Sequence, residues 1–342
     1  MSVGPRILIV NVNWIGDVLF STPSIRALRR KFPDAYLACW VPPRCKDLLS
    51  NNPHLDEVIV ASDDTSFFNW PGSLATAIRL RGKKFDTAIF FHRSKTKAWV
   101  ARLAGIRERI GFRSGPSGGL LTKAVPPPSG RPHRTDYFLA LLEGVGVPAQ
   151  GRAPEFVPRP GIEAEYAAVL NAGGVDPAAP YAVVHPGGNW DLKRWPAESF
   201  VRWIRLFRAR FPWKIVVIGT PPEEPLAAGI ASAFPEGVVS LCGKTSLDTL
   251  ALLLKGSRFL LSNDSGPIHL AASQGTPILA LFGPTSASET GPLSGAAVRV
   301  LRKDVGCEVP CYFRSCDHRV CMELLTPEEV FAESERLALE TR

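Results

Sequence analysis

Short apolar runs alternate with helix-length segments along nearly the whole chain, and this alternation constrains the fold more than any other feature. Residues 6–12, 36–41 and 85–91 are expected to be strands, and residues 24–31 and 95–104 are expected to be helices. Alternation of this kind is typical of parallel sheets covered by helices. The sequence therefore predicts an α/β fold of the doubly wound class.

The alternation starts again in the second half of the chain. A stretch rich in Pro, Gly and Arg at residues 146–161 separates the halves, and new strands are expected at residues 181–185 and 258–262. The length of 342 residues suits two domains of roughly 150 residues better than one. We expect two Rossmann-like domains facing a cleft, at residues 1–160 and 161–325, with ligands bound at the carboxyl ends of the strands.

Composition excludes several classes of protein. The chain is 45% hydrophobic, which is too apolar for a disordered protein. No apolar run approaches the roughly 18 residues that a membrane-spanning helix needs, so no transmembrane segment is expected. The N-terminal residues lack a small-residue cleavage site, so we expect no signal peptide and a cytoplasmic location.

The charge is concentrated in the first half of the chain. Residues 1–160 hold 23 Lys and Arg against 12 Asp and Glu, and residues 79–134 hold fourteen basic residues against Asp86 and Glu108. Such asymmetry indicates an anionic partner, or else a solvated basic face. Nucleic acid is the weaker candidate, because no helix-turn-helix or zinc-finger spacing is present and aromatic residues are not interleaved with the basic ones.

The first predicted strand leads into a turn that contains Gly16 and Asp17. A glycine here permits unusual backbone angles or a close approach to a ligand. Asp17 is placed either to cap the following helix or to take a proton from an acceptor hydroxyl, and position alone does not separate the two roles. The turn contains no G-x-G-x-x-G, which argues against a dinucleotide dehydrogenase.

In the second half, the strand at residues 181–185 leads into a glycine-rich turn. Gly187 and Gly188 expose backbone N–H groups, and Lys193 and Arg194 supply cations beside them. This turn is either a cradle for a diphosphate or a surface loop with two solvated cations.

The strand at residues 258–262 leads into a second such turn. Ser265 and Gly266 begin the next helix and form an anion site through their backbone N–H groups. Because Asp264 would repel a phosphate, we expect it to bind sugar hydroxyls or to fix the loop. A third turn, at residues 283–286, follows the next strand, and three such turns in one half indicate a nucleotide diphosphate ligand.

The chain resembles the ADP-heptose:lipopolysaccharide heptosyltransferases of glycosyltransferase family 9 in three stretches, NVNWIGDVLFSTPSIRALRRKFPDA, HPGGNWDLKRWP and LSNDSGPIHLAASQGTPILALFGPTS. Their order and spacing match across nearly the whole chain. Residues 14–17 and 263–266 make the chain most similar to the heptosyltransferase II branch.

The resemblance implies a GT-B fold whose C-terminal helix, within residues 326–342, packs back toward the N-terminal domain. It implies inverting, metal-independent sugar transfer that requires no cofactor. The site residues it assigns are Asp17 as general base, Lys193 on the diphosphate, Asp264, Ser265, Gly266 and His269 on the donor, and Glu223 (or Glu224) on the adenosine ribose. With Gly187, Gly188 and Arg194 these form the predicted donor site, although some relatives carry hydroxyl residues where this chain has the two glycines.

The implied partners are an ADP-sugar donor and an anionic lipid A-core acceptor at the inner leaflet. The resemblance then implies that the basic stretch at residues 79–134 binds the acceptor, with Arg93, Lys95 and Lys97 as the expected contacts. The protein is expected to lie peripherally on the inner membrane. Alternatives are a transferase with a different nucleotide sugar or a protein acceptor, a GT-B nucleotide-sugar epimerase, and a binding module without catalysis.

Four of the seven cysteines are clustered near the C-terminus, at Cys307, Cys311, Cys316 and Cys321. Four thiols within fifteen residues are enough to enclose a structural zinc or iron ion. The spacing is not the common C-x2-C pair, so free thiols and disulfides formed after isolation remain alternatives.

Overall fold

The computed structural model describes residues 4–61, 70–113, 118–311 and 315–340. The chain separates into two compact units, Met1–Val157 and Pro158–Arg342. The boundary between them falls inside the Pro- and Gly-rich stretch at residues 146–161.

The first unit is built on a six-stranded parallel sheet with the strand order β3-β2-β1-β4-β5-β6. Its strands are β1 (Arg6–Val10), β2 (Tyr36–Val41), β3 (Glu57–Val60), β4 (Thr87–Phe90), β5 (Glu108–Phe112) and β6 (Lys123–Val125). In the central strand β1, Leu8, Ile9 and Val10 are completely buried. Both faces of a parallel sheet are covered, so its central strands are apolar along their whole length.

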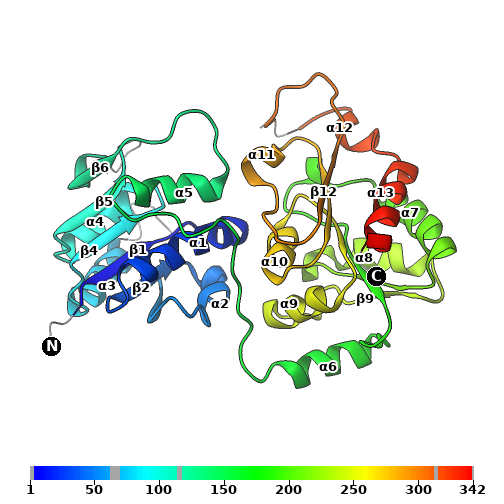
Figure 1. Ribbon diagram of the computed structural model, residues 1–342, viewed down its shortest axis with the longest axis horizontal. Helices are drawn as coiled ribbons and strands as arrows, with labels where there is room; N and C mark the ends of the chain where they lie inside the picture. The colour runs from blue at the N-terminus through cyan, green and yellow to red at the C-terminus, as the bar shows by residue number, and fades with distance from the viewer. Residues whose placement is uncertain (1–3, 62–69, 114–117, 312–314, 341–342) are drawn as a thin grey trace. The chain divides into compact units, whose positions relative to one another are not determined.

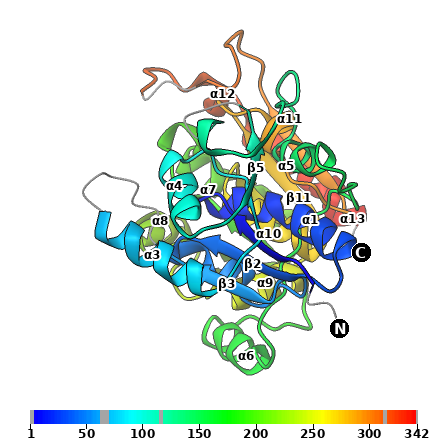
Figure 2. The ribbon, with the colours of Figure 1, turned by 90° about the vertical axis from the view of Figure 1, so that its left-hand side faces the viewer.

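The described residues of this unit form the α-helices α1 (Ile15–Lys31), α2 (Lys46–Leu49), α3 (Trp70–Gly82), α4 (Lys95–Leu103) and α5 (Arg134–Glu143). Helices α1 and α5 pack together, as do α3 and α4, and the two pairs cover opposite faces of the sheet (Figures 1 and 2). Helix α1 begins nine residues earlier than residue 24, where the sequence predicts it. The turn after β1 is therefore short, and Asp17 lies in the first turn of the helix.

The second unit repeats the design with the strand order β12-β11-β10-β7-β8-β9. Its strands are β7 (Tyr181–His185), β8 (Lys214–Val217), β9 (Val238–Ser240), β10 (Leu260–Asn263), β11 (Ile278–Phe282) and β12 (Val298–Arg302), all parallel. Its helices are α6 (Glu163–Ala172), α7 (Ala197–Arg210), α8 (Glu224–Ser232), α9 (Leu247–Gly256), α10 (Gly266–Gln274), α11 (Ala287–Thr290), α12 (Val320–Glu323) and α13 (Pro327–Glu340).

The C-terminal helix α13 packs against α7 of the second unit. The indole Nε1 of Trp203 on α7 donates to Ser334 Oγ on α13 at 3.0 Å, and Val330 and Leu337 are completely buried in the same core. That this helix also reaches the first domain, as the resemblance implies, stays a prediction.

Both sheets have one order when strands are counted from the start of each unit, 3-2-1-4-5-6. In the first unit, the strands from β1 to β3 follow one another toward one edge of the sheet, and those from β4 to β6 follow one another toward the other edge. The order therefore switches between β1 and β4, and in the second unit it switches between β7 and β10. In doubly wound folds ligands bind at the carboxyl ends of the strands at this switch point. Among the residues that the structure describes, no helix is both long and apolar enough to cross a membrane.

Candidate active site

The candidate base lies beyond the carboxyl end of β1, at the switch point of the first sheet. Asp17 keeps 20% of its side chain exposed, and its Oδ1 lies 3.4 Å from Nε of Arg134, the first residue of α5. The first turn of a helix favours a carboxylate, because the backbone N–H groups there carry partial positive charge. The arrangement provides an oriented and accessible acceptor for a proton.

The turn that carries Asp17 is fixed through Asn13. The Asn13 carbonyl accepts hydrogen bonds from Arg44 Nε at 2.8 Å and from Cys45 Sγ at 3.4 Å. The Asn13 side chain bonds Lys97 Nζ through Oδ1 at 2.9 Å, and its Nδ2 lies 3.3 Å from His92 Nε2. Asn13 therefore ties the end of β1 to the segments that follow β2 and β4.

The geometry gives Lys97 a role different from the predicted acceptor contact. Its side chain is buried, its Nζ also donates to the Asn11 carbonyl at 3.3 Å, and it lies 5.5 Å from the centre of the Trp40 ring. A buried ammonium that bonds Asn11 and Asn13 supports the turn before Asp17. The predicted contact of Lys97 with the acceptor stays a prediction.

The other two predicted acceptor contacts are on the surface. Lys95, the first residue of α4, is exposed. Arg93 is exposed as well, and its guanidinium bonds the Tyr137 hydroxyl, with Nε at 3.0 Å. Arg93 and Arg134 both lie over the Tyr137 ring, at 5.3 Å and 5.9 Å from its centre. Arg134 therefore joins the basic surface beside Asp17, a role that the sequence alone did not single out.

In the second unit, the predicted donor residues meet at the switch point between β7 and β10. Lys193 Nζ lies 2.8 Å from Asp264 Oδ2, and the same oxygen accepts a hydrogen bond from Thr285 Oγ1 at 2.6 Å. Asp264 is 4% exposed. All three turns that the sequence predicted as ligand-binding thus contribute a side chain to one cluster, in which Asp264 fixes the loops.

Asn263, the last residue of β10, positions the glycine-rich turn. Its Nδ2 donates to the carbonyls of Pro186 at 2.8 Å and Gly187 at 3.0 Å, and its Oδ1 accepts from the Trp195 amide at 3.1 Å. Asn263 is completely buried. Sequence reasoning did not select this residue, although an Asn at the end of an apolar strand was a usable signal.

Glu223 holds the same turn from the other side. Its carboxylate accepts hydrogen bonds from the Gly188 amide at 2.6 Å and from the amide and hydroxyl of Thr220 at 2.7 Å each. Burial raises the pKa of Glu223, but the His185 imidazole at 3.6 Å and the bonds from Thr220 outweigh it, so the pKa lies well below its usual range. A Cβ at Gly187 would overlap this carboxylate, which explains the glycine. The predicted ribose contact stays a prediction.

The remaining donor residues occupy consistent places. Ser265 is the N-cap of α10 and Gly266 its first residue, so backbone N–H groups lie at the end of β10. His269 is buried one turn further along α10. Arg194 bonds within its own turn, with Nε donating to the Gly188 carbonyl at 2.9 Å and Nη1 2.7 Å from Asp191 Oδ1.

The cysteine cluster has no formed metal centre in the described part of the chain. Cys307 and Cys316 are exposed, and Cys311 and Cys321 are half-buried. Burial raises the pKa of Cys321, and the Cys316 thiol adds to this effect. Among the residues described, no group of three or more His, Cys, Asp or Glu is placed to hold a metal ion. The zinc or iron ion stays a prediction.

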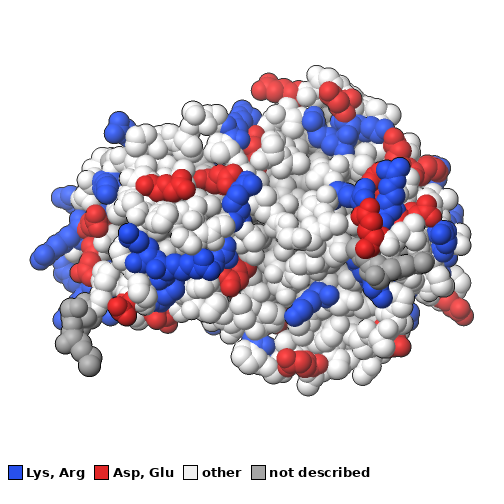
Figure 3. All heavy atoms as spheres, viewed as in Figure 1, with Lys and Arg blue, Asp and Glu red and all other residues white. Residues whose placement is uncertain are grey.

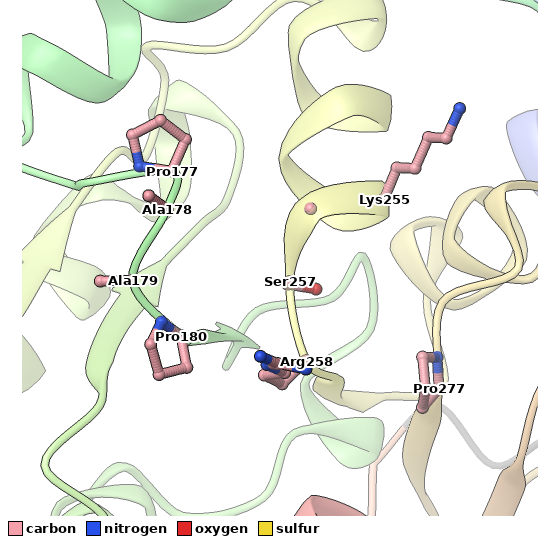
Figure 4. Close-up of a pocket in the computed structure, with 9 residues that line it drawn as sticks. Pro177, Ala178, Ala179, Pro180, Lys255, Ser257, Arg258 and Pro277 are labelled. Carbon is pink, nitrogen blue, oxygen red and sulfur yellow. The ribbon is translucent and has the colours of Figure 1, made fainter. Parts of the chain in front are cut away.

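A cavity elsewhere in the second unit contains none of the predicted site residues (Figure 4). It is lined by residues 177–180, 255–258 and Pro277, which precede β7, β10 and β11. It therefore lies at the amino ends of the strands, opposite to where doubly wound sheets bind ligands.

Comparison with known proteins identifies the family of the chain. The family model described as glycosyltransferase family 9 (heptosyltransferase) matches residues 74–317. The chain belongs to this family. It is therefore a glycosyltransferase, and the predicted fold class, α/β of the GT-B type, is confirmed.

Relatives within the family are named for one activity. The chain is 27% identical to lipopolysaccharide heptosyltransferase 2 of Escherichia coli over 88% of this chain and 89% of the relative. It is 28% identical to lipooligosaccharide heptosyltransferase 2 of Haemophilus influenzae over 85% and 87%. The solved structure of E. coli ADP-heptose lps heptosyltransferase II superposes with a TM-score of 0.80 at 25% identity, covering 98% of this chain and 99% of the other. The family 9 glycosyltransferase of Veillonella parvula, with a TM-score of 0.86 at 23% identity over 99% of both chains, shares the fold.

Proposed function

We propose that the protein is an inverting heptosyltransferase of the heptosyltransferase 2 type, which moves heptose from ADP-L-glycero-D-manno-heptose to the inner core of lipopolysaccharide. One observation carries the proposal. A carboxylate lies at the switch point of the first sheet, and a cation with a helix N-terminus lies at that of the second. The family and the named relatives support this assignment over an epimerase or a non-catalytic module.

The donor half of the reaction is assigned to the second unit. Lys193 and the backbone N–H groups at the start of α10 are suited to a diphosphate. Negative charge grows on the ADP leaving group as the glycosidic bond breaks, and groups fixed in advance stabilise that charge most strongly. Asn263 and Glu223 hold the glycine-rich turn, which keeps these groups in place.

The acceptor half is assigned to the first unit. Asp17 takes the proton from an acceptor hydroxyl as the oxygen attacks the anomeric carbon, and a single displacement of this kind inverts the configuration. Arg134 orients the carboxylate of Asp17. The exposed Arg93 and Lys95 offer positive charge to an anionic lipid A-core acceptor.

The direct test is a transfer assay read by mass spectrometry. Purified protein receives ADP-L-glycero-D-manno-heptose and a lipid A-core acceptor that already carries one heptose. We expect the acceptor to gain the mass of one heptose. If the donor binds and no such product forms, the acceptor is a different one, and if the donor does not bind, the proposed sugar nucleotide is wrong.

The Asp17→Asn variant tests the assignment of the base. Asn keeps the size of the side chain but cannot take the proton, so we expect transfer to fall by about 100-fold or more. Donor affinity, measured by calorimetry, should stay close to that of the unaltered protein. Transfer at near the normal rate would show that another group is the base.

A further inference from the structure

The outer surface of α3 and α4 carries large apolar side chains that face solvent. On α3, Trp70 is 58% exposed, Leu74 40% and Ile78 64%. These residues are spaced four apart and therefore lie along one stripe of the helix. On α4, Trp99 is 43% exposed and Leu103 is 38% exposed, again four residues apart. We call these five residues the α3–α4 apolar face.

The described residues of the fold cover these five side chains only in part. Other residues of the two helices supply the core, namely Ala77 and Leu80 on α3 and Ala98 and Ala101 on α4, all of them buried. The two helices also pack against one another, as Figure 2 shows, so their stripes belong to one side of the sheet. Exposed apolar groups gathered in this way indicate a contact with something other than water.

Exposed basic side chains lie on or beside the same two helices. Arg81, Lys84, Lys95 and Arg102 are exposed on or beside the two helices, whereas Arg79 and Lys83 lie 4.0 Å and 2.6 Å from oxygens of Glu57. Between residues 79 and 107 Asp86 is the only acidic residue in the sequence. The Arg102 guanidinium lies 5.8 Å from the centre of the Trp99 ring, so a cation borders the apolar surface directly. Basic side chains also gather at the left-hand end of the surface drawn in Figure 3, on the first unit.

The chemistry of this face favours one occupant. Tryptophan prefers the boundary between lipid chains and headgroups, and apolar residues with a basic rim are typical of surfaces that lie on anionic membranes. A second copy of the chain would bring two basic rims together, and like charges facing each other oppose association.

We propose that the α3–α4 apolar face docks on the surface of an anionic lipid bilayer. The apolar side chains enter the headgroup boundary, and the surrounding Lys and Arg bind lipid phosphates. The inference rests on this surface alone and does not require the transfer reaction.

The test is co-sedimentation of the full chain with vesicles, without any sugar nucleotide or acceptor. Vesicles of phosphatidylcholine with phosphatidylglycerol are compared with vesicles of phosphatidylcholine alone. We expect binding to the anionic vesicles that weakens as salt is added, because exposed charges are screened. Brominated acyl chains should quench Trp fluorescence, and the Trp70→Phe/Trp99→Phe variant should lose that quenching.

Two sets of variants separate the apolar and the electrostatic contributions. Leu74→Ser/Ile78→Ser should lower the partition coefficient about tenfold or more, because both side chains lose their burial in lipid. Arg81→Gln/Lys84→Gln/Arg102→Gln should lower binding to anionic vesicles and flatten its salt dependence. The matched control is Val300→Ser/Leu339→Ser, which replaces two apolar residues of the second unit that are 39% and 43% exposed.

Several outcomes would overturn the proposal. It is wrong if the unaltered protein does not bind anionic vesicles at low salt. It is also wrong if the Leu74→Ser/Ile78→Ser variant binds them as well as the Val300→Ser/Leu339→Ser control does. It is also wrong if sedimentation velocity finds a dimer that the apolar variant abolishes while vesicle binding is absent, since a second copy then covers the face. Thermal unfolding of each variant checks folding, because replacing exposed residues should leave the melting temperature nearly unchanged.

Discussion

At the scale of single residues, the second unit places ionisable side chains in contact with one another and with the glycine-rich turn. Lys193 is paired with Asp264, and Glu223 accepts hydrogen bonds from Gly188 and Thr220. A diphosphate that binds Lys193 therefore has to share it with Asp264. Both acidic residues hold loops in the structure, which is a role that the order of residues along the chain does not reveal.

The acid sensitivity of folding should depend on Glu223. Its folded pKa lies below the ordinary value of 4.5, so as the pH falls the unfolded chain binds the proton first and protonation favours unfolding. Glu223→Gln should lower the free energy of unfolding at pH 7 by about 1–3 kcal/mol. That difference should shrink as the pH falls below about 4.5, as urea denaturation at several pH values would measure. A difference that does not change with pH would contradict the assigned charge.

At the scale of elements, short segments after the strands carry the candidate site residues, and neighbouring elements hold these segments. The turn between β1 and α1 is fixed by Asn13, which bonds Lys97 on α4 and Arg44 in the segment after β2. The glycine-rich turn after β7 is fixed by Asn263 at the end of β10. Each candidate site is therefore held in place by hydrogen bonds from elements that are distant in sequence.

Lys97 should act as a positioning residue. Lys97→Met removes the donor to Asn13 while keeping an unbranched side chain, so we expect the kcat of transfer to fall about 10-fold or more as Asp17 loses its exact place. The KM for acceptor should change little. Lys95→Met, on the same helix but exposed, is the matched control and should raise the acceptor KM instead. If Lys97→Met instead raises the acceptor KM and leaves kcat unchanged, Lys97 contacts the acceptor.

The packing of α13 on α7 should contribute strongly to stability. Leu337 is completely buried, so Leu337→Ala should lower the free energy of unfolding by about 2–5 kcal/mol. Leu339→Ala, two residues on and 43% exposed, is the control and should cost less than about 1 kcal/mol. Equal effects in chemical denaturation would mean that the helix is not docked as described.

At the scale of the whole molecule, the chain consists of two units with the same sheet topology, to which we assign different substrates. Both sheets have the same strand order, yet residues 1–160 carry the excess of positive charge. We connect that excess with an anionic acceptor and a membrane surface, and we connect the polar cluster around Asp264 with the donor.

ADP binding should protect one unit selectively. Hydrogen exchange with saturating ADP should slow at residues 186–195, 219–224 and 264–266, since these residues form the proposed donor site. An ADP concentration 100 times its Kd should raise the stability of the unit that binds it by about 2.7 kcal/mol. Lys193→Ala should reduce the protection. If ADP slows exchange only within residues 4–157, the nucleotide binds the first unit and the proposed donor site is wrong.

Much of this protein follows from its sequence. The period of apolar runs predicts the α/β class, because a parallel sheet needs buried strands and covering helices. Glycine and charged residues directly after strands predict which turns bind ligands, since the carboxyl ends of parallel strands share one edge. Strands such as β12, where Arg299 and Arg302 interrupt the apolar pattern, were not predicted, because an edge strand is covered on fewer sides.

Only the tertiary structure decides which of those residues face a ligand and which hold the turns. Lys97 and Lys95 are two residues apart on one helix, yet one is buried against Asn13 and the other is exposed. Arg134 reaches Asp17 across 117 positions of sequence, and Asn263 reaches Gly187 across 76. A local pattern specifies the elements because their periodicity is local, whereas contacts between distant residues exist only after the elements pack.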